Sequence, residues 1–152
     1  MSASSLTRRG KMLLSLVVGS SILAHGQTVH AVVPKQPEFH LVSMLRAIAQ
    51  VETGTNDISR PCRKIGKAGE RSAWQIKKVV WVKYTHAPFE SASTNATLAS
   101  VVAALHIQSL REIAEKKRLP VTFSIACAWN CGPRVGDYAT RVSALYGEFS
   151  RQ

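Results

Sequence analysis

The stretch "LVSMLRAIAQVETG", residues 41–54, decides the fold class because its apolar residues recur at helical spacing. Leu41, Leu45 and Ile48 form one apolar stripe of an amphipathic helix. Gly54 is a typical stop signal at the C-terminal end of such a helix. The next position on the stripe is Glu52, an ionisable residue where an apolar side chain is expected. We therefore predict a helix over about residues 39–52 that carries an acid at the inner end of its buried face.

Helical patterns recur in the second half of the chain. One long apolar stripe ends before Pro120 and consists of Leu98, Val101, Val102, Leu105 and Ile113. The segment "TFSIACAWN", residues 122–130, predicts a short buried helix. The apolar spacing over residues 135–149 predicts a last amphipathic helix.

Two segments between these helices lack a clear period. Residues 53–72 are rich in glycine, polar and charged residues, which is typical of a long loop or a small irregular lobe. Residues 73–85, "AWQIKKVVWVKYT", fit either a strand or a short strand that leads into a helix. We expect a mainly α fold in which helices surround one core and a cleft, with a small β or loop lobe.

The N-terminal residues have the features of an export signal. Arg8, Arg9 and Lys11 form a basic region, Met12 to Leu23 is apolar, and the small residue Ala31 ends a candidate cleavage site. The apolar run of about a dozen residues is shorter than the roughly 20 residues that span a bilayer. We predict a signal peptide over residues 1–31, an extended lead over 32–38 and one domain over 39–152. The protein is then exported to the periplasm or secreted, and an uncleaved anchor is the alternative.

The charge of the chain favours an anionic partner. The full sequence has 20 basic and 9 acidic residues, and removal of the predicted signal leaves 17 basic and 9 acidic residues, a net charge of +8. A cell-wall polymer, a membrane surface and a nucleic acid all fit this excess. The basic residues are scattered and do not alternate with aromatic ones, so we expect no nucleic acid partner. We also expect no membrane span, no cofactor and a monomer.

Three cysteines, Cys62, Cys127 and Cys131, bear on redox chemistry. In an exported protein they are most simply one disulfide and one free thiol. Cys127 and Cys131 are expected to share a face of one helix, and a bond from Cys62 to either of them would close a long loop. The pairing stays open. No zinc-motif spacing is present, so we expect no metal site.

The acid at Glu52 has a chemical interpretation as well as a structural one. A carboxyl against apolar walls has a raised pKa because burial disfavours its charged form. A carboxyl that stays protonated near neutral pH can act as the general acid in cleavage of a glycosidic bond. The structural alternative is a helix-end carboxylate that turns toward solvent.

Three segments, "AIAQVETG", "GKAGERSAWQIKKVVW" and "IACAWNCGPRVGDYATRV", resemble in order three motifs of the lytic transglycosylase and goose-type lysozyme superfamily. The family patterns are "QVESG", "GAxGLMQI" and "AYNAGPxxVxxY". The resemblance covers about residues 40–146. It implies a lysozyme-like fold, α+β with a small or vestigial β region, and cleavage of peptidoglycan by a single glutamate.

The resemblance also implies roles for individual residues. The catalytic acid falls on Glu52. The residues implied or inferred to bind substrate are Gln75, Asn130, Trp129, Trp74 and Ser72. Amide side chains can hold sugar hydroxyl and N-acetyl groups, and indole faces can stack on sugar rings. A position in the core is the alternative for both tryptophans.

The sequence departs from the family pattern at three of these places. Trp129 replaces a tyrosine, which removes a phenol close to the catalytic acid. Ser72 replaces a glycine, and Thr53 replaces the serine that follows the acid. These changes bear on efficiency and on product chemistry more than on the fold.

Asp57 and Glu70 are the candidates for a second carboxylate that positions water, and a solvated loop acid is the alternative for each. His106 is expected to be structural or at the surface. We expect an exported enzyme that binds peptidoglycan glycan strands and cuts the β-1,4 bond between N-acetylmuramic acid and N-acetylglucosamine. The alternatives are a wall-binding module without turnover and, on charge alone, a protein that binds nucleic acid or membranes.

Overall fold

The first helix forms where the sequence predicts it. In the computed structural model, which describes residues 38–152, α1 spans Leu41–Thr53 and ends at Gly54, whose φ of 78° is left-handed. Glycine adopts this conformation without strain, and the Gly54 amide donates to the Gln50 carbonyl at 3.0 Å. The buried face of α1 includes Met44, Leu45, Ala47, Ile48 and Ala49.

Five further helices follow in the described residues. They are α2 (Lys78–Tyr84), α3 (Ser91–Thr94), α4 (Ala96–Lys116), α5 (Val121–Trp129) and α6 (Val135–Phe149). The Asn95 side chain accepts from the Leu98 amide at 2.9 Å and so caps the start of α4. The prediction of a mainly α fold is confirmed.

The segment between α1 and α2 contains an isolated β bridge. Arg71 and Ile76 form an isolated antiparallel bridge, with N···O distances of 3.0 and 2.7 Å. The chain reverses between them at Ser72 and Gln75, whose φ angles are 74° and 48°. Residues 73–85 thus begin in this tight turn, and their second half is helical in α2.

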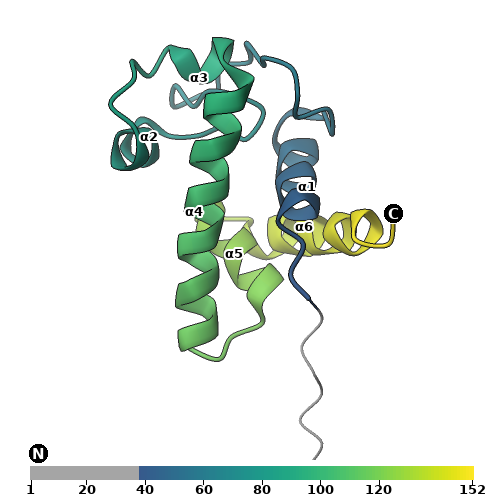
Figure 1. Cartoon of the computed structure of the whole chain (residues 1–152). Helices are drawn as coiled ribbons and strands as arrows, with labels where there is room; N and C mark the ends of the chain where they lie inside the picture. The colour runs from purple at the N-terminus through teal and green to yellow at the C-terminus, as the bar shows by residue number, and fades with distance from the viewer. Residues whose placement is uncertain (1–37) are drawn as a thin grey trace, which may run out of the picture. The chain divides into compact units, whose positions relative to one another are not determined.

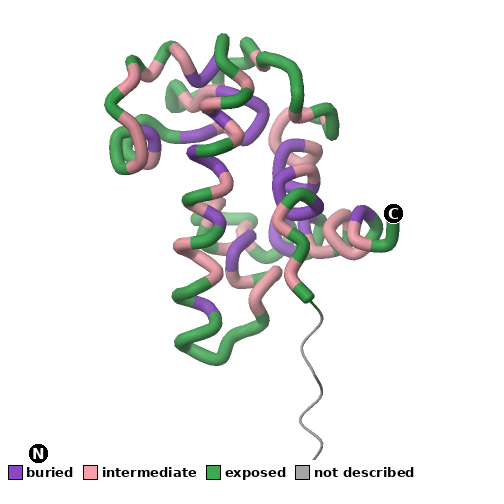
Figure 2. Tube along the Cα trace, viewed as in Figure 1, coloured by how far each residue is buried: buried purple, intermediate pink, exposed green. Residues whose placement is uncertain are grey.

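The helices pack around a shared core (Figure 1). α6 lies across α1 and α5, and α4 contacts α5, α3, α2 and α1. Figure 2 shows buried residues gathered along α1 and at intervals along α4. The largest fully buried side chains include Trp74, Trp81, Met44, Ile48, Ile107 and Ile125. This packing fixes the end of α1 against α6 and so positions Glu52.

The buried face of α4 differs from the predicted stripe. Val101, Leu105 and Ile113 are 48%, 41% and 49% exposed. The buried positions are Ala99, Val102, Ala103, Ile107 and Ala114. Apolar residues surround much of this helix, so spacing alone does not identify the inner face. Alanine lines the inner face, where its small side chain lets neighbouring helices approach closely.

The prediction that Cys127 and Cys131 share one helix is wrong. α5 ends at Trp129 because Asn130 is extended (φ −120°, ψ 94°), so Cys131 lies beyond the helix, just before "GP". Cys62, Cys127 and Cys131 are all free thiols in this structure, and the expected disulfide is not formed in it.

Part of the domain prediction concerns residues outside the described part. The signal peptide over 1–31 lies wholly there, and the lead over 32–38 is described only at Glu38. Within residues 38–152, none of the helices combines the length and apolarity that crossing a bilayer requires.

Candidate functional site

A cavity of about 260 Å³ opens beside the C-terminal end of α1. It lies where α1, the segment between α1 and α2, α2, α4 and the end of α5 meet. Its walls are formed by Glu52, Gly66, Lys67, Glu70, Gln75, Ile76, Lys77, Val80, His106, Trp129 and Asn130. We call it the Glu52 cavity. It brings together the predicted acid with Glu70, Gln75, Trp129 and Asn130.

Glu52 is held in this cavity by a phenol from the last helix. The Tyr138 hydroxyl donates to Glu52 Oε1 at 2.9 Å. Tyr138 is 8% exposed, and α6 packs directly on α1, so the contact rests on the core. The phenol beside Glu52 thus comes from Tyr138, which lies in the third of the three segments and received no role of its own in the sequence analysis.

The environment of Glu52 favours its protonated form. Burial raises the pKa of Glu52 above the ordinary 4.5, and the negative charge of Glu70 raises it further. The hydrogen bond from Tyr138 and the charges of Lys64 and Lys77 lower the Glu52 pKa but do not cancel the effect of burial. Burial, then the Glu52 charge, holds the pKa of Tyr138 far above its ordinary 10.0, so the phenol remains a donor.

Glu70 reaches the cavity from a tight turn. Its Oε2 accepts from the Ala68 amide at 2.9 Å, and its carbonyl accepts from the Gly66 amide at 2.8 Å. A Cβ atom at Gly66 would collide with Glu70 Oε2 and Gln75 Oε1. The missing side chain at Gly66 is thus what allows the carboxylate and the amide to converge on one wall.

Gln75 and Asn130 both line the cavity, and each has one end of its amide held by the backbone. The Gln75 amide nitrogen donates to the carbonyls of Ser72 and Lys64 at 3.1 and 3.3 Å, so its oxygen remains as the acceptor. Asn130 Oδ1 accepts from the Gly132 amide at 3.1 Å, and Asn130 Nδ2 forms no hydrogen bond within residues 38–152. One amide therefore offers an acceptor and the other a donor.

Two aromatic side chains, His106 and Trp129, line the cavity, and Tyr84 contacts His106 without lining it. His106 lies between the other two, with ring centroids 5.9 Å from Tyr84 and 5.3 Å from Trp129. Its Nδ1 is 3.3 Å from the Tyr84 hydroxyl oxygen. Burial, and then the charge of Lys83, lowers the pKa of His106, so the imidazole is neutral at neutral pH. His106 thus lines the cavity and is half-buried, a position compatible with the expected structural or surface residue.

Two predicted substrate-binding residues are in the core instead. Trp74 and Ser72 are each 1% exposed. The Trp74 indole donates to the Leu45 carbonyl at 2.9 Å, and the Trp129 indole donates to the Trp74 carbonyl at 3.2 Å. The Ser72 hydroxyl accepts from the Trp74 amide at 3.3 Å. Neither side chain lines the cavity. Trp74 and Ser72 instead pack beneath the residues that form its walls, and the Trp74 carbonyl accepts from the indole of Trp129.

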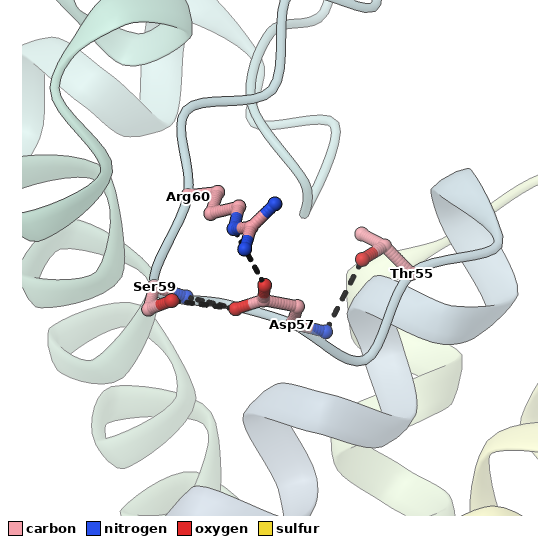
Figure 3. Close-up of polar contacts among 4 residues, drawn as sticks. All are labelled: Thr55, Asp57, Ser59 and Arg60. Carbon is pink, nitrogen blue, oxygen red and sulfur yellow. Dashed lines mark hydrogen bonds and ion pairs between the residues drawn. The ribbon is translucent and has the colours of Figure 1, made fainter.

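Asp57 does not belong to the site. It lies in the exposed loop after α1, where its carboxylate accepts from the Ser59 amide and hydroxyl at 3.1 and 2.6 Å (Figure 3). Arg60 pairs with its other oxygen at 3.1 Å. The Ser59 hydrogen bonds lower the pKa of Asp57 below its ordinary 3.8. Asp57 is absent from the cavity wall, so its prediction as a second carboxylate is wrong, whereas Glu70 lines that wall.

Sequence reasoning missed Tyr138 and His106 for different reasons. A buried tyrosine needs a partner for its hydroxyl, and the match of Val135 and Tyr138 to the "VxxY" of the third family pattern could have raised that question. The partner, 86 residues away, has no local signal. His106 lies next to exposed residues on α4, and only the packing of Trp129 reveals its position.

Comparison of the chain with protein-family models, with curated proteins and with solved structures finds no match. Within residues 38–152, no group of three or more histidine, cysteine, aspartate or glutamate side chains is placed to hold a metal ion.

Proposed function

We propose that the protein cleaves the β-1,4 glycosidic bond between N-acetylmuramic acid and N-acetylglucosamine in peptidoglycan. The observation that carries this proposal is the carboxyl of Glu52, which is buried enough for its pKa to be raised and yet lines an open cavity. A carboxyl with a raised pKa beside a cavity with amide groups and aromatic side chains suits an amino sugar.

In the proposed mechanism, Glu52 donates its proton to the glycosidic oxygen as the C1–O bond breaks. The N-acetyl group of the muramyl sugar stabilises the positive charge at C1, so no second carboxylate is needed at that carbon. The ionised Glu52 then accepts a proton from the hydroxyl that attacks C1. The Tyr138 phenol stabilises the ionised state through its hydrogen bond to Glu52 Oε1.

The attacking hydroxyl determines the product. Attack by the sugar's own C6 hydroxyl gives a 1,6-anhydro ring, whereas attack by water gives a reducing end. Glu70 is the described carboxylate, besides Glu52, that lines the cavity, and it is a candidate to position a water. Its negative charge also raises the pKa of Glu52, which supports the general-acid role.

A wall-binding module without turnover is the second candidate. The amide nitrogen of Gln75 is committed to the carbonyls of Lys64 and Ser72, and Trp129 stands where the family has a phenol. Such a protein would retain the cavity and bind glycan strands without cleaving them. The proposed export from the cell and the excess of positive charge suit both candidates, because each would act on the anionic cell wall.

Digestion of purified peptidoglycan by the wild type, Glu52→Gln and Asp57→Asn separates the two candidates. We expect the wild type and Asp57→Asn to release muropeptides at equal rates. We expect Glu52→Gln to be slower by about 100-fold or more, because it lacks the acidic proton. Equal release by Glu52→Gln and the wild type would exclude Glu52 as the acid, and binding without release by the wild type would favour the module.

Mass analysis of the sugar ends then tests the role of Glu70. Anhydro and reducing ends differ by the mass of one water. If Glu70 positions water, Glu70→Gln shifts the products toward anhydro ends. An unchanged product ratio would leave Glu70 only its electrostatic effect on Glu52.

A further inference from the structure

A second, more open cavity of about 540 Å³ lies next to the Glu52 cavity. It is bounded by the turn after α5 and by the first two turns of α6. Its walls are Asn130, Gly132, Pro133, Arg134, Asp137, Tyr138 and Arg141, which we call the arginine groove. Asn130 lines both cavities, and Tyr138 reaches from the groove to Glu52. The two cavities therefore share the wall at Asn130.

The charged side chains of the groove form no ion pairs with other described residues. Arg134 and Arg141 are both exposed, and neither forms an ion pair within residues 38–152. Asp137 lies between them in sequence, is also exposed and is also unpaired there. Two guanidinium groups and one carboxylate give the groove a net positive charge. Guanidinium groups bind carboxylates through paired, charge-assisted hydrogen bonds.

The substrate of the proposed reaction carries its negative charge in a matching place. The sugars of the glycan strand are N-acetylated, so the charge resides mainly in the acidic peptide attached to the muramyl sugar. That peptide leaves the ring at C3, next to the C4 oxygen that takes part in glycosidic bonds. A strand with a muramyl sugar near Glu52 thus carries its acidic substituent on the same ring as the bond to be cleaved, and the arginine groove adjoins the Glu52 cavity at Asn130.

We propose that the arginine groove binds the carboxylates of this peptide through Arg134 and Arg141, so that the protein prefers peptide-bearing strands to bare glycan. The inference rests on the proposed function and adds the part of the substrate that is recognised outside the Glu52 cavity. Asp137 weakens the attraction and limits how tightly an anionic product is held.

The test compares peptide-bearing glycan strands with the same strands after enzymatic removal of the peptides. For Arg134→Gln/Arg141→Gln we expect KM on peptide-bearing strands to rise on the order of tenfold, with kcat and the kinetics on bare strands unchanged. Asp137→Asn should lower KM on peptide-bearing strands only. The control Lys116→Gln/Lys117→Gln removes the same charge at the end of α4 and should behave as the wild type.

The two proposals fail in different ways. Suppose that the wild type cleaves both substrates. If the KM of the double arginine variant then rises equally on both substrates, or on neither, the groove does not bind the peptide. If the wild type cleaves neither substrate, the proposed function fails, and with it the inference drawn from it. Circular dichroism of each variant checks that the fold is retained.

Discussion

Two carboxylates that are five residues apart, Glu52 and Asp57, have opposite environments. Glu52 ends the buried face of α1 and has a pKa raised chiefly by burial. Asp57 lies in the following loop and has a pKa lowered chiefly by the hydroxyl and amide of Ser59. Their intrinsic chemistry is nearly the same. The difference shows that the helix end, by placing one acid in a cavity and leaving the other in solvent, decides the direction in which the pKa of each carboxyl is shifted.

The largest effect on the rate of muropeptide release is expected when the length of each acidic side chain is changed, by Glu52→Asp and by Asp57→Glu. Glu52→Asp keeps the charge but withdraws the carboxyl from Tyr138 and from the bond to be cleaved. A misplacement of about 1 Å can cost on the order of 100-fold in rate, so we expect a loss of that size in muropeptide release. Asp57→Glu should retain wild-type activity. An equal loss in both variants would show that the loop contributes to catalysis.

Removing the phenol should have a smaller effect with a clear sign. The Tyr138 hydrogen bond lowers the pKa of Glu52, so Tyr138→Phe should raise it and move the alkaline limb of the pH–rate profile to higher pH. At the optimum we expect roughly a fivefold loss, equivalent to one hydrogen bond of about 1 kcal/mol. Phenylalanine preserves the ring in the core. A shift of the limb to lower pH would contradict the assigned hydrogen bond.

The pH dependence of the free energy of unfolding should also distinguish Glu52 from Asp57, and this measurement needs no substrate. Because the pKa of Glu52 is raised in the folded state, the protonated carboxyl contributes to the free energy of unfolding. That contribution is complete below pH 4.5 and is lost as the pH rises through the folded-state pKa. Glu52→Gln cannot ionise, so its urea midpoint should fall less than that of the wild type between about pH 4.5 and 8.

Asp57 contributes with the opposite sign: its stabilisation is present above pH 3.8 and is lost as the pH falls through the lowered pKa. Asp57→Asn should therefore lose stability relative to the wild type at neutral pH rather than at low pH. Parallel urea curves for all three proteins at every pH would contradict both assignments.

The smallest expected effect is confined to the loop. Ser59→Ala removes the hydroxyl that donates to Asp57 at 2.6 Å and leaves the backbone amide in place. The pKa of Asp57 should then move up toward 3.8, while that of Glu52 stays unchanged. Carboxyl carbon NMR titration measures both groups in one experiment. Movement of the Glu52 titration would mean that the two regions are coupled.

Much of the helical fold could be predicted from local signals. The apolar spacing before Glu52, the stop at Gly54 and the break before Pro120 all act within a few residues of the structure that they produce. For residues 73–85 the structure is close to the second predicted alternative, a bridge residue followed by a helix, and the choice between the two could not be made from propensity because β-branched residues fit both.

The site depends on contacts that no local pattern encodes. Trp74 was misplaced because its burial comes from α1, where its indole binds the carbonyl of Leu45. Tyr138 was missed because its hydroxyl has meaning only once α6 lies on α1. Asp57, by contrast, had a readable local signal, since an aspartate two residues before a serine commonly binds that serine's backbone amide in a turn.

The contact between Tyr138 and Glu52 also has a consequence for biosynthesis. The two residues are 86 positions apart, and Asn130 likewise comes from the last part of the chain. A ribosome therefore completes the glutamate well before it makes the phenol and the amide. A chain that ends before α6 therefore contains the whole of α1 but lacks the phenol that contacts the Glu52 carboxyl.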